Sequence, residues 1–159
     1  MLNEYLQFSR SSFSDKTEKF NISDLVNKTI ENFEKNNIQC QILEKVMFNG
    51  RKNLIQRCFN NLINNSLKYA KKVKISLERN KNNLIFFIED DGQGIPVTEY
   101  ENVFKPFYKI DKGRSDAKSS VGLGLSISSD IIRSHGGYIE LGKSFLSSES
   151  MWSSISTLL

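Results

Sequence analysis

The sequence has few of the residues that stabilise proteins through crosslinks or metal ions. It contains two cysteines, Cys40 and Cys58, and one histidine, His135, in 159 residues. The cysteines lack the short spacing of a metal-binding pair, and Cys58 falls on an apolar helical pattern. We therefore expect two reduced, buried thiols, and neither a disulfide nor a cysteine-based metal site.

Long apolar runs and a secretion signal are also absent. No run approaches the length of about 20 residues that crosses a bilayer, and the first residues do not follow the charged, apolar and small-residue order of a signal peptide. The length suits one domain and a short appendage. We expect this piece to be cytoplasmic, and an inner-membrane anchor in a longer parent stays open.

Arginine is scarce beside lysine, although the net charge is +4. Lys68, Lys71, Lys72 and Lys74 cluster, as they would in a protein that binds a polyanion. Lysine and asparagine are abundant throughout, however, which indicates a compositional habit of the source genome and a solvated basic face. We expect no nucleic-acid partner.

Glycine is nearly missing from the first half of the chain. Eight of the nine glycines come after residue 91, which separates a helix-and-strand half from a glycine-punctuated half that we expect to hold the moving loops. Apolar spacing predicts helices over 23–35, 53–69 and 123–134, with Ser23 as the N-cap of the first. It predicts strands over 20–22, 39–43, 46–48, 72–78, 84–88 and 138–141. Asn49 and Gly50 are typical of a turn before the second helix.

The most informative turn follows the apolar run 84–88. It reads Asp90-Asp91-Gly92-Gln93-Gly94, two carboxylates with two glycines spaced two apart. Glycines in this position remove side chains that would block a flat or phosphorylated ligand. A plain surface turn with a capping carboxylate explains the same residues, so both interpretations stay open.

Two further stretches are typical of phosphate binding. The helix predicted over 53–69 carries a polar row beside its apolar stripe, made of Arg57, Asn61, Asn65 and Lys68. Amide and ammonium groups one turn apart are what a phosphate and metal site would use. Downstream, the glycine-led helix start at 122–125 would present backbone amides and the positive end of a helix dipole to an anion.

Four stretches, in this order, resemble the ATP-binding domain of sensor histidine kinases, within the superfamily of gyrase, heat-shock ATPase, histidine kinase and mismatch-repair proteins. Residues 61–70 resemble the N box, 90–95 the G1 box, 104–108 the F box and 122–125 the G2 box. The resemblance covers about residues 18 to 142. It implies an α/β fold of the Bergerat type, a two-layer sandwich of a mixed, largely antiparallel sheet with helices on one face.

The resemblance also implies a Mg²⁺-ATP site. Asp90 would accept the adenine amine, which guanine lacks, while Gly92, Gly94 and Ile95 would lie beside the base. Asn65 would be the Mg²⁺ ligand.

The remaining implied contacts are to ribose and phosphates. They comprise Asn61, Lys68 and Tyr69 on the helix, Lys109 at the start of an ATP lid over 109–121, and Gly122, Leu123, Gly124 and Leu125 at the phosphate tail. Asn65, Asn61 and Lys68 would form the catalytic set.

One position bears on the type of reaction. The ATPase branches place a glutamate four residues before the metal-binding asparagine, and here that residue is Asn61, whose amide cannot act as a general base. Transfer to a histidine needs less activation, so the sequence favours a protein-histidine kinase over an ATPase. A non-catalytic nucleotide-binding module of a degenerate kinase is the alternative, because Lys109 stands where an arginine is common, Ser120 replaces a glycine, and the last residues lack the usual ending.

The resemblance implies that the chain is part of a larger signalling protein. Residues 1–17 would be the tail of a dimerisation-domain helix and a linker, and 18–159 the catalytic and ATP-binding domain. The expected partners are the histidine-bearing dimerisation domain of the same kinase, in a homodimer, and the receiver domain of a response regulator. His135 precedes two glycines at a helix end, where we expect a capping role and no phosphorylation.

Overall fold

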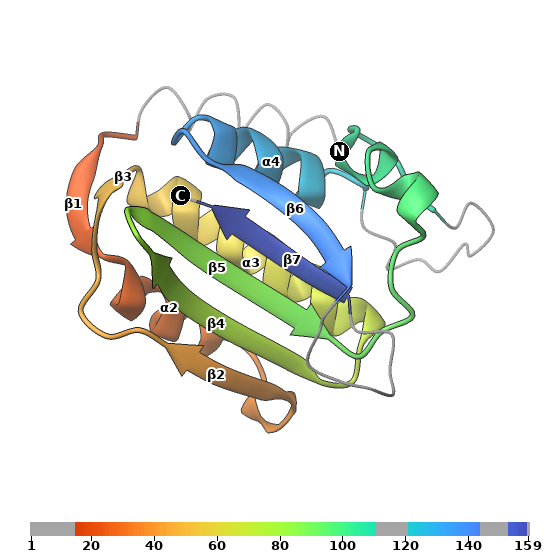
Figure 1. Ribbon diagram of the computed structural model, residues 1–159, viewed down its shortest axis with the longest axis horizontal. Helices are drawn as coiled ribbons and strands as arrows, with labels where there is room; N and C mark the ends of the chain where they lie inside the picture. Colours follow the sequence, from red (N-terminus) through yellow and green to blue (C-terminus); the bar gives the residue numbers. More distant parts are fainter. Residues whose placement is uncertain (1–14, 111–120, 144–152, 159) are drawn as a thin grey trace.

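A five-stranded sheet forms one layer of the protein. The computed structural model describes residues 15–110, 121–143 and 153–158. In spatial order the strands are β2 (Ile38–Ile42), β4 (Val73–Asn80), β5 (Asn83–Asp90), β7 (Ser153–Leu158) and β6 (Tyr138–Lys143), as Figure 1 shows. Only β2 and β4 are parallel, and the other neighbours are antiparallel. The predicted mixed, largely antiparallel sheet is confirmed.

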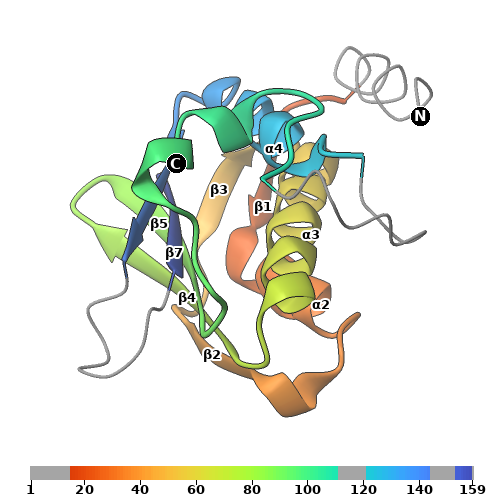
Figure 2. The ribbon, with the colours of Figure 1, turned by 90° about the vertical axis from the view of Figure 1, so that its right-hand side faces the viewer.

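Three helices form the second layer and cover one face of that sheet (Figure 2). They are α2 (Ile22–Ile30), α3 (Lys52–Tyr69) and α4 (Gly124–Arg133). A separate two-stranded sheet pairs β1 (Glu18–Asn21) with β3 (Met47–Gly50), and the 3₁₀ turns are η1 (Lys35–Asn37), η2 (Val97–Glu99) and η3 (Asn102–Phe104). The two-layer sandwich is therefore confirmed. None of the helices in the described part of the chain is long and apolar enough to cross a membrane.

The core lies between α3 and the central strands. The buried residues of α3 recur at three- and four-residue spacing, which places them on one face of the helix: Leu54, Ile55, Cys58, Phe59, Leu62, Ile63 and Ser66. β5 alternates instead, with Leu84, Phe86, Ile88 and Asp90 buried. The rings of Phe59 and Phe86 stack with centroids 4.2 Å apart, which joins the two patterns at the middle of the interface.

The start of α2 differs from the prediction. Asn21, and not Ser23, is the N-cap, because its Oδ1 accepts hydrogen bonds from the backbone N–H groups of Ser23 (3.0 Å) and Asp24 (3.4 Å). The Ser23 hydroxyl donates to the Leu43 carbonyl (2.5 Å) and accepts from the Val46 N–H (3.1 Å). Ser23 therefore ties α2 to the connection between β2 and β3. The helix ends at Ile30, short of the predicted residue 35.

Two local predictions about β2 and β3 are wrong. Asn49 and Gly50 lie inside β3, paired with Lys19 and Glu18, and do not form a turn. Of the two thiols expected to be buried, only Cys58 is buried, whereas Cys40 is exposed on β2. Burial raises the pKa of the Cys58 thiol to about 12, so this group is an inert core residue.

The last described residues form β7, a strand beyond those predicted from apolar spacing. β7 inserts between β5 and β6, with Ile88 opposite Ile155 and Leu141 opposite the same residue on the other side. The predicted helix within residues 1–10 and most of the predicted lid, residues 111–120, lie outside the described residues. The proposed domain boundary near residue 17 remains a prediction.

His135 joins the end of α4 to the start of α3. Its Nδ1 lies 2.7 Å from the Ile131 carbonyl and its Nε2 accepts the Arg51 backbone N–H at 3.0 Å. Since a carbonyl can only accept and an N–H can only donate, these partners select the neutral ring with its proton on Nδ1. Gly50 is required next to this ring, because a Cβ there would lie 3.0 Å from His135 Cδ2 and 2.4 Å from the Phe48 ring.

Burial lowers the pKa of His135 below its ordinary value of 6.5, and the nearby Arg51 charge lowers it further, against the opposing effect of the Ile131 carbonyl. The unfolded chain therefore binds the proton more readily than the folded protein does. The stabilisation is fully present above about pH 6.5 and is lost as the pH falls through the folded pKa.

We predict that His135→Ala lowers the free energy of unfolding at pH 7.5 by about 1–2 kcal/mol, because the Arg51 N–H loses its acceptor. The difference between the two proteins should shrink at pH 5, where the native ring is forced toward its charged form. Urea denaturation at both pH values measures it, and no other histidine titrates in the chain. A difference that stays constant with pH contradicts the assigned tautomer.

Candidate functional site

The predicted ligand-binding turn follows β5 directly. Asp90 is 6% exposed, and its Oδ1 accepts the Gly92 N–H at 3.1 Å, so it does cap the turn. Gly94 has a φ of 73°, a conformation that favours glycine. A Cβ on Gly92 would lie 2.9 Å from Asp90 Oδ1 and 2.9 Å from the Tyr69 carbonyl oxygen. Gly92 is therefore needed for the close approach of this turn to the end of α3.

Asp91 fastens the turn to the connection between α3 and β4. Its Oδ1 accepts hydrogen bonds from the backbone N–H groups of Lys71 and Lys72, both at 2.8 Å. Its own N–H donates to the Lys72 carbonyl at 3.1 Å. These three bonds hold the first residue after β5 against the connection from α3 to β4. Sequence reasoning missed this role, and the second carboxylate of the Asp-Asp pair was the available signal.

The polar row of α3 faces the start of α4. The Nδ2 atom of Asn61 lies 3.5 Å from the Gly124 carbonyl, so the N box and the G2 box meet here. Asn65 is half-buried one turn further along α3. Lys68 and Tyr69 are exposed at the end of the helix, with the Lys68 ammonium 5.2 Å from the centre of the Tyr69 ring. The row thus runs from α4 to the Asp90 turn.

The F box packs on the first glycine of the G2 box. The Phe107 N–H donates to the Gly122 carbonyl at 3.0 Å. A Cβ on Gly122 would lie 2.8 Å from the Tyr108 carbonyl oxygen, and φ is 79° at Gly122 and 64° at Phe107. The residues on either side of the predicted lid are therefore joined by direct backbone contact.

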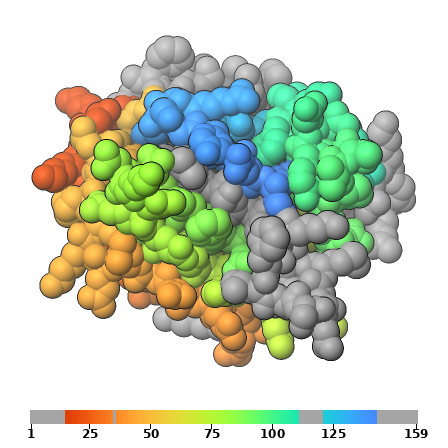
Figure 3. All heavy atoms as spheres, in the orientation of Figure 1, coloured from red at the N-terminus to blue at the C-terminus, as the bar shows by residue number. Residues whose placement is uncertain are grey.

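Glu99 anchors the same segment. Its carboxylate accepts hydrogen bonds from the Tyr108 hydroxyl and the Asn102 amide (3.2 Å), and Lys105 donates to Asn102 at 2.7 Å. The bond from Tyr108 lowers the pKa of Glu99, and the same bond raises the pKa of Tyr108. Figure 3 shows the residues of η2 and η3 (blue-green) as one block at a corner of the sheet face. Sequence reasoning did not anticipate Glu99.

The other predicted residues lie around this arrangement. Ile95 is half-buried after the Asp90 turn, and Lys109 is exposed beyond the F box. Leu123 is buried in the core and Leu125 packs against it, so their side chains stabilise the start of α4, and any contact to an anion falls to the backbone there. The structure thus brings together the α3 row, the Asp90 turn and the Gly122–Leu125 segment.

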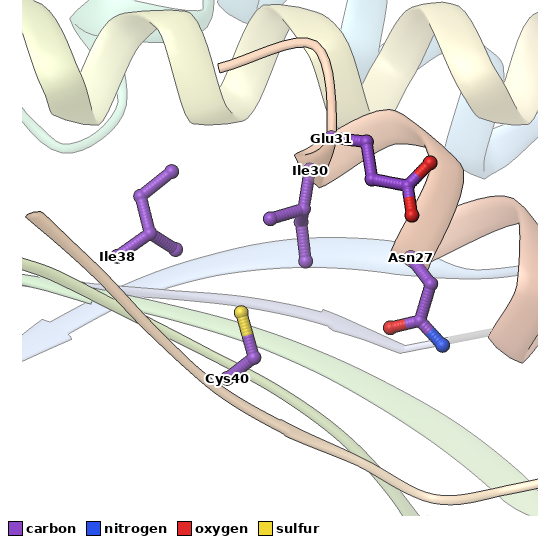
Figure 4. A pocket seen from close by; sticks show the side chains of 5 residues that line it. All are labelled: Asn27, Ile30, Glu31, Ile38 and Cys40. Atoms are coloured by element: carbon purple, nitrogen blue, oxygen red, sulfur yellow. The ribbon is translucent and has the colours of Figure 1, made fainter. Parts of the chain in front are cut away.

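One pocket lies away from these motifs. It has a volume of about 370 Å³, between α2 and β2, and is lined by Asn27, Ile30, Glu31, Ile38 and Cys40 (Figure 4). None of these residues belongs to the four boxes, and no sequence motif indicated this pocket. Within the described ranges no three histidine, cysteine or acidic residues gather as a metal site would require.

Comparison with known proteins agrees with this geometry. The family model of the histidine kinase-, DNA gyrase B- and HSP90-like ATPases matches residues 50–155. The chain belongs to this family. That match spans the N, G1, F and G2 boxes, and it confirms the resemblance to the catalytic, ATP-binding domain of sensor histidine kinases.

Individual members of the family are also similar. The sensor histidine kinase GtrS of Pseudomonas aeruginosa is 34% identical over 92 residues, 58% of this chain and 19% of that protein. The sensor protein kinase WalK of Staphylococcus aureus is 30% identical over 152 residues, 87% of this chain and 25% of that protein. The chain therefore spans a quarter or less of the length of these relatives.

Solved structures share the fold. The mycobacterial sensor histidine kinase MprB superposes with a TM-score of 0.78 at 19% identity, over 91% of this chain and 97% of that chain. Full-length ShkA, solved in complex with AMPPNP, superposes with a TM-score of 0.76 at 17% identity, over 98% of this chain and 34% of that chain.

We predict that Asp91→Ala destabilises the protein by about 1–3 kcal/mol, because two backbone N–H groups lose a charged acceptor. Asp91→Asn should cost less, since its amide oxygen can still accept. Chemical denaturation measures both. Equal stability of Asp91→Ala and the unmodified protein would contradict the role of Asp91 as the fastening residue.

Proposed function

We propose that this chain binds Mg²⁺-ATP and donates the γ-phosphoryl group to a histidine on the dimerisation domain of the same kinase, which then signals to a response regulator. The observation that supports it best is the meeting of the three motif segments. Tyr69 contacts Gly92 at one end of the α3 row, and Asn61 contacts Gly124 at the other. A nucleotide placed along this row would reach from the Asp90 turn to the start of α4.

The base would bind at the Asp90 turn. Asp90 is buried there at the end of β5, where its carboxylate can accept the exocyclic amine of adenine, whereas guanine presents an oxygen at that position. Gly92 and Gly94 would leave the base in contact with backbone. Ile95 would pack beside it.

The phosphates would lie between α3 and the start of α4. Asn61, Lys68 and Tyr69 would contact ribose or phosphate, Lys109 would reach the phosphates from the lid, and the backbone amides at 122–125 would receive the phosphate tail. The residues at this place suit Mg²⁺. They offer one half-buried amide, Asn65, and no carboxylate cluster among the described residues, as expected for an ion held largely by phosphate oxygens and water. When bound, Mg²⁺ neutralises charge on the transferring phosphoryl group.

A phosphoacceptor outside this chain is supported by the position of His135. Both ring nitrogens of this single histidine are engaged, one with the Ile131 carbonyl and one with the Arg51 N–H. It also lies beyond the end of α4 opposite to the proposed phosphate site. Asn61, whose amide contacts Gly124, supplies no general base for water, which favours transfer over hydrolysis.

The alternative is a nucleotide-binding module that no longer catalyses. It is compatible with the same base and phosphate contacts, and with the lysine at position 109. Phosphotransfer to an added dimerisation domain separates the two functions.

We predict that ATP and ADP bind with Mg²⁺, and that GTP binds at least about tenfold more weakly. Asp90→Asn should weaken ATP binding about ten- to a hundredfold, because a charged acceptor for the adenine amine is lost. Calorimetric titration measures the affinities, and circular dichroism checks the fold. Equal affinity for ATP and GTP, or a folded Asp90→Asn variant with unchanged affinity, would exclude the base site proposed here.

We predict that Asn65→Ala abolishes the Mg²⁺-dependent part of ATP affinity and lowers phosphotransfer about a hundredfold, as the loss of one electrostatic contact in a transfer site does. Asn64→Ala is the matched control, since Asn64 is exposed on the same turn of α3. Transfer from γ-labelled ATP to a separately added dimerisation domain provides the readout. An equal loss in both variants would show that the asparagine row is structural.

A further inference from the structure

Two buried serines have hydroxyl groups without a hydrogen-bond partner among the described residues. They are Ser66 on α3, 2% exposed, and Ser128 on α4, fully buried. A buried hydroxyl without a hydrogen-bond partner destabilises a protein by about 1–3 kcal/mol, so each of them calls for an explanation. Only Ser66 lies in one of the segments that form the proposed site.

The packing of α3 on β5 places Ser66 and Asp90 at the same end of the interface. Phe59 and Phe86 stack on each other, and Ser66 follows Phe59 by seven residues on the same buried face of α3. Asp90 follows Phe86 by four residues on the same buried face of β5. These steps correspond to about 10 Å along a helix and about 13 Å along a strand. The two elements run in the same direction (Figure 1), so both residues lie at the same end of the interface.

Contacts at that end bring the two segments within reach of each other. A Cβ added to Gly92 would lie 2.9 Å from Asp90 Oδ1 and 2.9 Å from the Tyr69 carbonyl oxygen. These two oxygen atoms are therefore no more than twice that distance apart. Tyr69 is one helical turn beyond Ser66, whose own carbonyl accepts the Ala70 N–H at 3.0 Å. The bonds of Asp91 to Lys71 and Lys72 hold this arrangement in place.

We propose that Ser66 is a second base-reading residue, whose hydroxyl donates a hydrogen bond to N1 of adenine, directly or through one water molecule. This inference rests on the proposed ATP site. On the Watson–Crick edge of adenine the exocyclic amine is a donor and the neighbouring N1 is an acceptor. Asp90 can satisfy the amine but, as a carboxylate, has no proton for N1. A serine hydroxyl can supply that proton.

Ser66→Ala tests the inference, with Ser128→Ala as the matched control. Both changes remove a buried hydroxyl without a partner, so neither should lower the unfolding midpoint. Only Ser66→Ala should weaken ATP binding, by about three- to tenfold, which is the effect of one neutral hydrogen bond. In the unmodified chain, 1-deaza-ATP, which lacks the N1 acceptor, should bind about three- to tenfold more weakly than ATP, and Ser66→Ala should remove that preference.

The outcomes separate this inference from the proposed function. One outcome overturns the inference alone. The unmodified chain binds ATP and 1-deaza-ATP equally well, and Ser66→Ala binds ATP as tightly as the unmodified chain does. Ser66 is then only a core residue. If the unmodified chain binds no ATP, the proposed function fails and the inference fails with it. The 1-deaza-ATP comparison requires no variant, so it decides the question even if Ser66→Ala does not fold.

Discussion

The fastening of the Asp90 turn to the end of α3 is the constraint on which the candidate site depends. Asp91 accepts two backbone hydrogen bonds from Lys71 and Lys72 and returns one to the Lys72 carbonyl. Both partners belong to the short link between α3 and β4, so the bonds fix the end of β5 relative to the end of the helix. Gly92 can then approach the Tyr69 carbonyl closely. Without this link, the proposed base and phosphate contacts would sit on elements free to shift relative to each other.

α3 carries two functions on two faces. Its apolar stripe packs on β5 through the Phe59–Phe86 stack, while its polar row extends between α4 and the Asp90 turn. Ser66 lies where the buried face approaches the site, and its hydroxyl is one of the few buried polar groups without a partner among the described residues. The helix that packs the core therefore also carries the proposed ligand-binding row, and the rigid packing of one face positions the other.

A second set of contacts, centred on His135, holds the start of α3 against the end of α4. His135 bridges the Ile131 carbonyl and the Arg51 N–H, and Arg51 also donates to the Ser134 carbonyl and hydroxyl. Arg51 is the N-cap of α3, and its side chain does not cap the helix. The end of α4 instead supplies the acceptor for the Arg51 backbone N–H. This contact keeps the two helices antiparallel, so that the start of α4 lies beside Asn61.

The sequence by itself indicated most of the helices and strands and the four motif segments that form the candidate site, because periodicity and short motifs are local properties. The stripe of α3, the alternation of β5 and the residues of the four boxes can all be read without coordinates. Tertiary structure alone decided the partners across space: Asp91 with Lys71 and Lys72, Ser23 with the β2–β3 connection, Gly50 against His135, and β7 between β5 and β6. A carboxylate, a hydroxyl or a glycine has several possible roles in a turn, and only the long-range packing, which no local pattern contains, selects one of them.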